Sequence, residues 1–314
     1  ITTYNAILGW VAHNGLDLKT NDDARYLEGV FSRYQKAPIA ITKPKRLRVL
    51  THRWHCPHQY ELYRSGHDFT LVTGAGTGLC DSWEWDKRPM PANARFVRRD
   101  DIDPRDYDVA LVHFDENVLH PERCHGKVPM DWGATLNWFV REMPLPKIGV
   151  CHGTPQFAGQ YDGNYAGADL GKVNEASRQE LVNYLKDIFV VCNSHQARDE
   201  WGFARSRTIW HGFSPHEYPN LAHNGRVLTM LGAALDNRPH YNGKFVVQRI
   251  EELLGRGVVH PLHVPEPPQS YAKGGQDWAE SKFRNYARAV GAYSAYLNPT
   301  LRSPMPRSRG EAML

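Results

Sequence analysis

The sequence lacks any hydrophobic run long enough to span a bilayer, and no hydrophobic leader stretch opens it. It also lacks a strong charge of either sign, because 38 Lys and Arg stand against 34 Asp and Glu, a formal net charge of +4. A dedicated nucleic-acid surface carries a larger positive excess, whereas this mild balance suits anionic small molecules. We therefore expect a protein without a transmembrane segment that acts on small anionic ligands.

The five cysteines are scattered along the chain and form no Cys-x-x-Cys pair. Cys151 and Cys192 each close an apolar run, where a buried thiol behaves as a small hydrophobic side chain. This usage favours a reducing compartment, so the expected location is cytoplasmic.

The length of 314 residues exceeds the size at which a single core keeps growing, which predicts two domains. Residues 1–42 predict a helical extension and a linker that contains proline. Residues 43–220 form the expected first domain, a proline-bearing loop near 214–225 marks the boundary, and residues 221–314 form the expected second domain.

Short, continuously apolar runs alternate with helical patterns in both domains. This alternation predicts parallel sheets covered on both faces, and hence an α/β protein of two Rossmann-like domains. The expected strands are 47–51, 69–72, 107–113, 147–151, 188–192, 207–210, 227–231, 260–264 and 290–297. The expected helices are 59–64, 135–143, 174–185, one capped by Ser194, 245–254 and 277–290.

Ligands of such sheets bind at the loops that follow the carboxyl ends of the strands. In the first domain these loops carry polar side chains suited to holding an acceptor substrate. The expected acceptor-side residues are Thr51, His52, Arg53, Asp115, His152, Gly153 and Thr154.

The segment His52–His58 offers four metal-ligating side chains within seven positions. Zinc sites usually draw their ligands from two separated pairs, and no distant partner pair is evident here. The segment therefore favours a loop that lines a cleft, and we expect no metal.

Two other motifs are weak. Gly74–Gly78 follows a strand, but Leu79 stands where a dinucleotide fingerprint has its third glycine, and no helical pattern follows. A flexible loop is the favoured interpretation. Cys151 and His152 are neighbours on a strand and face opposite ways, so their adjacency does not indicate a catalytic pair.

Two basic loops of the second domain predict an anion site. Arg238 and Lys244 lie between its first strand and first helix, where a planar fork and a point charge together suit a diphosphate. The stretch Arg302–Arg309 adds three further arginines ahead of Gly310–Met313, which is typical of a first helical turn with unpaired N–H donors.

These residues resemble the GT-B glycosyltransferases, and in particular the retaining glycosyltransferase family 4. The resemblance spans residues 46–314 and rests on four stretches in the family's order. They are His152-Gly153-Thr154, Val191–Ser194, Gly232–Lys244 and Arg302–Met313.

The resemblance implies a role for each matching residue. Glu311 matches the second Glu of the family's Glu-x7-Glu motif, which contacts the ribose, while Ser303 stands where the first Glu would contact the donor sugar. Arg238 and Lys244 match the basic pair, and His152 matches a histidine near the transferred sugar. The implied catalytic residues are His152, Arg238, Lys244 and Glu311. The implied donor site comprises Gly232, Arg238, Lys244, Ser303, Met305, Arg307, Ser308, Arg309 and Glu311.

The sequence thus predicts a metal-independent enzyme that moves a sugar from a UDP- or GDP-type donor to an acceptor with retention of configuration. It implies no cofactor, and the acceptor is a glycan, a lipid-linked molecule, a small molecule or, least favoured, a nucleic acid. A non-catalytic nucleotide or sugar-phosphate binding protein is the main alternative, and a nucleic-acid-modifying glycosyltransferase is the other. Because the family's fold continues beyond the Glu helix, we expect the second domain to be incomplete at Leu314 and the chain to be a fragment.

Overall fold

The computed structural model describes residues 45–78, 80–116, 118–119, 128–155, 175–219, 221, 226–229 and 243–298. By its internal contacts the chain divides into two units, Ile1–Lys45 and Arg46–Leu314. The predicted helical extension lies outside the described residues, and everything below concerns the second unit.

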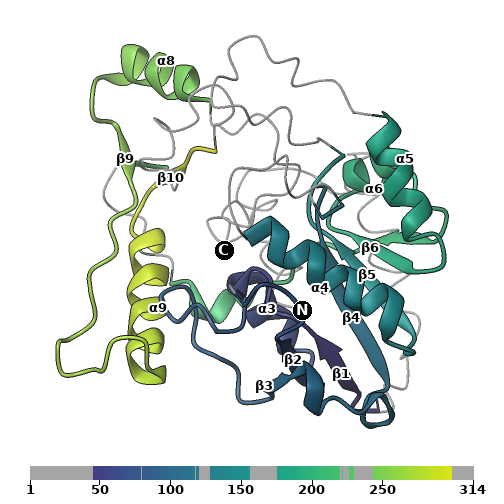
Figure 1. Ribbon diagram of the computed structural model, residues 1–314. Coiled ribbons are helices and arrows are strands. Elements are labelled where there is room, and N and C mark those ends of the chain that lie inside the picture. The colour runs from purple at the N-terminus through teal and green to yellow at the C-terminus, as the bar shows by residue number, and fades with distance from the viewer. Residues whose placement is uncertain are drawn as a thin grey trace, which may run out of the picture. The chain divides into compact units, whose positions relative to one another are not determined.

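A seven-stranded parallel sheet organises this unit, with the strand order β3-β2-β1-β4-β5-β6-β7 (Figure 1). The strands are β1 Arg48–Thr51, β2 Asp68–Thr73, β3 Ala94–Arg98, β4 Val109–Phe114, β5 Lys147–Cys151, β6 Phe189–Cys192 and β7 Ser206–Thr208. The helices between them are α3 Cys56–Tyr63, α4 Val128–Glu142, α5 Glu175–Tyr184 and α6 His195–Trp201, with short 3-10 turns at Arg99–Asp101, Pro104–Asp106 and Pro215–Glu217.

Both faces of the sheet are covered, because alternate residues of a strand enter different clusters. On β1, Val49 packs with Tyr63 of α3, whereas Leu50 packs with Phe139 of α4. All four side chains are almost fully buried. The prediction of an α/β fold with a parallel sheet covered on both sides is confirmed.

A second, three-stranded parallel sheet has the order β10-β8-β9. Its elements are β8 Val227–Thr229, α8 Lys244–Leu254, β9 Val259–Pro261, α9 Gln276–Gly291 and β10 Ala295–Tyr296. Gly255 ends α8, as the sequence predicts. The arrangement of two domains across a cleft stays a prediction, as do the boundaries at 42 and 220.

Two predictions about elements are corrected. The run 290–297 is not one strand, because α9 continues to Gly291 with Phe283, Ala287 and Val290 buried at helical spacing, and only Ala295–Tyr296 pairs with β8. The edge strand β3 escaped prediction because two of the five residues in its sequence, Ala-Arg-Phe-Val-Arg, are arginines, and charged side chains are common on exposed sheet edges.

The helix α9 is joined to α3 and to the loop before β3 by aromatic contacts. Phe283 meets the ring of Tyr60 edge-on at 5.5 Å between centroids. The guanidinium of the buried Arg88 lies 4.2 Å from the centroid of Phe283 and 4.9 Å from that of Tyr286. A cation between two aromatic faces is stabilised by the negative charge density of both rings.

Candidate functional site

The order of the seven-stranded sheet reverses between β1 and β4. From β1 the chain continues to β2 and β3 on one side, and from β4 it continues to β5, β6 and β7 on the other. The chain therefore turns to opposite sides after β1 and β4, and by the rule for open α/β sheets the carboxyl ends of these strands are the expected place of a ligand crevice. Of the predicted acceptor-side residues, Thr51 ends β1, the residues His52, Arg53 and Asp115 lie in the loops after these two strands, and residues 152–154 follow β5.

The loop after β1 is held by a single buried side chain of α3. Gln59 accepts a hydrogen bond from the main-chain N–H of Trp54 at 2.8 Å and donates one to the carbonyl of His52 at 2.7 Å. Gln59 is fully buried, so water does not compete for these contacts. The path of residues 52–54 is thus fixed by the helix that follows it.

His52 also helps to hold the loop after β1 in place. The main-chain N–H of His113 donates to its Nε2 at 3.1 Å, so Nδ1 carries the hydrogen and donates to the carbonyl of Arg53 at 3.2 Å. Burial lowers the pKa of His52 to about 4, which keeps the ring neutral at physiological pH. Both ring nitrogens are occupied by protein groups, so His52 links β1 to β4 beneath the crevice.

Four other histidines lie close together in this region. We call His58, His113, His152 and His211 the histidine cluster. Nδ1 of His113 lies 3.0 Å from Nε2 of His152, and Nδ1 of His58 lies 3.1 Å from Nδ1 of His211. They come from α3, from β4, from the loop after β5 and from the segment after β7. In the sequence, the segment 52–58 has no evident partner for its metal-ligating side chains. The structure brings three histidines from distant parts of the chain to His58, the last residue of that segment.

Aromatic side chains pack against the histidine cluster. Trp54 stacks on Trp132 of α4 at 3.6 Å between ring centroids, and it stacks on His152 at 5.1 Å. Trp54 is fully buried and Trp132 nearly so. Burial, and after it the neighbouring histidines, hold the pKa of His113 and of His152 well below the ordinary value, so both rings are neutral.

The remaining acceptor-side residues surround this crevice. Arg53 is nearly buried and forms an ion pair with Glu84 at 3.2 Å. Gly153 adopts a left-handed φ of 115°, and its carbonyl accepts a hydrogen bond from the indole N–H of Trp201 at 3.1 Å. A side chain at position 153 would reach within 3.5 Å of Glu116. Thr51 and Thr154 are buried, and Asp115 is half-buried at the end of β4.

On the predicted donor side the structure describes one residue. Lys244 is the first residue of α8 and follows Gly243, whose φ of 67° turns the chain into the helix. The other predicted donor residues lie outside the described residues. They are Gly232, Arg238, Ser303, Met305, Arg307, Ser308, Arg309 and Glu311.

The glycine loop, residues 74–78, is built around a carboxylate of the protein itself. Asp131 of α4 accepts hydrogen bonds from the main-chain N–H of Thr77, of Gly78 at 3.0 Å and of Cys80 at 2.8 Å. Gly76 passes so close that a Cβ there would overlap Oδ1 of Asp131. Donors that would face a phosphate in a dinucleotide site are occupied by Asp131, and no dinucleotide geometry arises.

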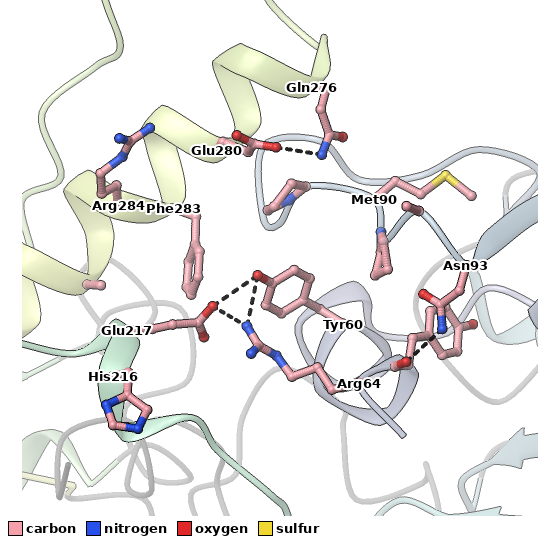
Figure 2. A pocket seen from close by; sticks show the side chains of 15 residues that line it. Tyr60, Arg64, Met90, Asn93, His216, Glu217, Gln276, Glu280, Phe283 and Arg284 are labelled. Atoms are coloured by element: carbon pink, nitrogen blue, oxygen red, sulfur yellow. Dashed lines mark hydrogen bonds and ion pairs between the residues drawn. The ribbon is translucent and has the colours of Figure 1, made fainter. Parts of the chain in front are cut away.

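A groove of about 670 Å³ lies elsewhere, between α3, the loop before β3 and α9 (Figure 2). Tyr60 donates a hydrogen bond to Glu217 at 3.0 Å, and Arg64 forms an ion pair with the same carboxylate. Gln276 donates to Glu280 at 2.8 Å across one turn of α9. Tyr60, Arg64 and Glu217 are thus paired with one another, as are Gln276 and Glu280, whereas the hydroxyl of Tyr63 and Oε2 of Glu217 have no hydrogen-bond partner among the described residues.

No protein-family model matches the chain, and no curated protein matches its sequence. Among solved structures the chain is similar to an apo structure of OtsA, with a TM-score of 0.31 and 10% identity over 86% of this chain and 76% of that chain. A TM-score of this size supports no conclusion about function. Within the described part of the chain, no helix combines the length and apolar character needed to cross a membrane.

The sequence predicted polar residues at the carboxyl ends of these strands, but it did not predict that four histidines come together there. His113 ends an apolar strand, and His211 follows another, so each was visible as a histidine at a strand's carboxyl end. The missing signal was strand order, because only the pairing of β1 with β4, and of β4 with β5, brings these ends together. Gln59 and Asp131, which hold the two loops, carry no motif.

Proposed function

We propose that this protein is a glycosyltransferase that moves a sugar from a nucleoside diphosphate sugar to an acceptor. The observation that carries the proposal is the place of Lys244, at the first turn of α8 in a parallel β8–α8–β9 unit. The amino end of such a helix combines directed N–H donors, a favourable dipole and here a cationic side chain, which together suit a diphosphate. The sequence around it resembles family 4 of the retaining enzymes.

The donor side would act on the leaving group. Breaking the bond between the anomeric carbon and the diphosphate oxygen leaves growing negative charge on that oxygen. In the proposal Lys244, Arg238 and the N–H groups near 307–310 stabilise this charge, so that the diphosphate needs no metal ion. Glu311 would hold the ribose hydroxyls, and Ser303 would face the donor sugar.

The first-domain crevice would hold the acceptor. Arg53, Asp115, Gly153 and Thr154 surround it, and His152 would stand beside the transferred sugar. As a neutral ring, His152 can donate or accept a hydrogen bond to a sugar hydroxyl but brings no charge. The acceptor oxygen would attack from the face that the diphosphate leaves, which retains the anomeric configuration.

The test is binding of a panel of UDP- and GDP-sugars to the purified chain by calorimetry. A charge-assisted contact is worth about 1.5–3 kcal/mol, so Lys244→Ala should weaken binding roughly 10- to 150-fold. Glu311→Ala should weaken it by a similar factor. Lys273→Ala removes an exposed cation of the same region and is the matched control, which should leave affinity unchanged.

Two results would overturn the proposal. If Lys244→Ala and Glu311→Ala keep the affinity of the parent chain for every nucleotide sugar that it binds, the donor site is misplaced. If the parent chain binds a nucleotide sugar but transfers no sugar to any glycan, lipid-linked or small-molecule acceptor, the protein is a binding protein rather than an enzyme.

A further inference from the structure

The histidine cluster contains a set of side chains with the chemistry of a metal site. His58, His113 and His152 each offer one ligand nitrogen, and these nitrogens all lie within 4.8 Å of one another. The closest pair, Nδ1 of His113 and Nε2 of His152, is 3.0 Å apart. Nitrogens bound tetrahedrally to Zn²⁺ at about 2.0–2.1 Å stand roughly 3.4 Å from each other. A modest rotation of the rings therefore suffices to place an ion between them.

A second observation concerns the most buried member. His113 is fully buried, and among the described residues its ring has no hydrogen-bond partner apart from His152, because its Nδ1 faces Nε2 of His152 and its Nε2 has no partner. An ion that replaces the contact between Nδ1 of His113 and Nε2 of His152 therefore breaks no other hydrogen bond of this buried ring. We propose that His58, His113 and His152 bind one divalent transition-metal ion of the Zn²⁺ class.

The ligand type defines the class of ion. Three imidazole nitrogens with no carboxylate among them suit Zn²⁺, Cu²⁺ or Ni²⁺, whereas Mg²⁺ and Ca²⁺ require oxygen ligands. Of the nitrogen-preferring ions, Zn²⁺ accepts three protein ligands and keeps a fourth position for water or a substrate oxygen. His113 lies near the carboxyl end of β4, His152 directly follows β5, and His58 is on the helix after β1, so the site is at the edge of the sheet where ligands of such folds bind.

The three ligands stand on rigid supports, as a metal site requires. His113 belongs to β4, which pairs with strands on both sides. The main-chain N–H of His152 donates to the carbonyl of Phe114 at 2.9 Å, which extends the pairing of β5 with β4. His58 lies on α3, next to the buried Gln59 that fixes the preceding loop.

His211 completes the arrangement as a positioning residue. Its Nδ1 lies 3.1 Å from Nδ1 of His58, so it can hydrogen-bond the ring nitrogen of His58 that does not face the ion and hold that ring in place. Removing such a partner typically costs 10- to 100-fold in metal affinity, less than the loss of a ligand. The inference stands apart from glycosyl transfer, and if both hold, His152 acts at the sugar through the ion that it binds.

The experiment uses the full chain, freed of metal with a chelator and titrated with Zn²⁺ and with Co²⁺ as a spectroscopic substitute. We expect one tightly bound ion per chain and the visible absorption of Co²⁺ in a low-symmetry nitrogen site. His58→Ala and His152→Ala, both at half-buried positions, should each remove that absorption and lower the Zn²⁺ affinity at least 100-fold. His211→Ala should lower the affinity 10- to 100-fold and keep the Co²⁺ spectrum.

His263→Ala is the matched control, since this exposed histidine lies far along the chain and should leave binding unchanged. Circular dichroism of each variant shows whether it folds. Failure of the folded parent to bind Zn²⁺ stoichiometrically would refute the site. So would equal Zn²⁺ affinity in the parent, His58→Ala and His152→Ala, which would assign the bound ion to other residues.

Discussion

The carboxyl ends of the neighbouring strands β1 and β2 carry two loops of different composition, the histidine-rich segment 52–58 and the glycine loop 74–78, and the two differ in what their polar groups contact. Each is held by one buried side chain from the opposite layer, Gln59 of α3 for the first and Asp131 of α4 for the second. Asp131 occupies the donors of the glycine loop with a negative charge. Gln59 fixes the backbone that leads into α3, the helix that carries His58 of the histidine cluster. A polar loop whose partners come from the protein is structural, and one with unmet groups is a candidate ligand site.

The largest effect should come from Gln59→Ala. The change leaves the N–H of Trp54 and the carbonyl of His52 buried without partners, at about 1–3 kcal/mol each, for a total loss of about 2–6 kcal/mol. Urea unfolding of the parent and variant measures it. Gln179→Ala, which removes an exposed glutamine of α5, should change stability by less than about 0.5 kcal/mol. If Gln59→Ala lowers the free energy of unfolding by less than about 0.5 kcal/mol, the loop is held by other contacts.

The next effect should come from Asp131→Ala. The buried N–H of Cys80 loses its partner, whereas those of Thr77 and Gly78 are more accessible to water, so we expect a loss of about 2–3 kcal/mol. Asp199→Ala on the exposed face of α6 is the control. Nearly equal free energies of unfolding of Asp131→Ala and Asp199→Ala would show that the glycine loop does not depend on the carboxylate of Asp131.

Gly76→Ala should cost about 1–3 kcal/mol, because its Cβ would overlap Oδ1 and the carbonyl of Asp131. Gly212→Ala has open space around the new methyl group and should be nearly neutral. If the double variant Gly76→Ala/Asp131→Ala is more stable than the sum of the single changes predicts, the clash with Asp131 is confirmed.

The smallest effect concerns pH. Burial alone would raise the pKa of Asp131, but hydrogen bonds from Cys80 and Thr77 outweigh it and lower the pKa below the ordinary value. The carboxylate therefore contributes stability above its unfolded pKa and loses it as the pH falls through the folded pKa. Asp131→Asn should be less stable than the parent at neutral pH, and the difference should shrink in acid. A constant difference across this range would contradict the assignment.

The sequence predicted the strands of the seven-stranded sheet better than it predicted the histidine cluster. Apolar runs such as 147–151 and 188–192 give strands within one residue, because burial on both faces leaves a continuous hydrophobic signal. Ser194 caps α6 through a hydrogen bond from the N–H of Ala197, as its position before a helical pattern predicts. The histidine cluster could not be predicted in the same way, since strand order is a tertiary property that no local pattern encodes. Ser303 and Glu311 stay predictions.

The contact between His58 and His211 joins residues 153 positions apart in the chain. Closing so long a loop costs entropy that only assembled neighbours repay, so we expect this contact to form late in folding, after the strands between the two residues have paired. Interactions absent from the transition state govern how fast a native protein opens rather than how fast it forms. We therefore expect the histidine cluster to slow unfolding and so to prolong the lifetime of the folded state.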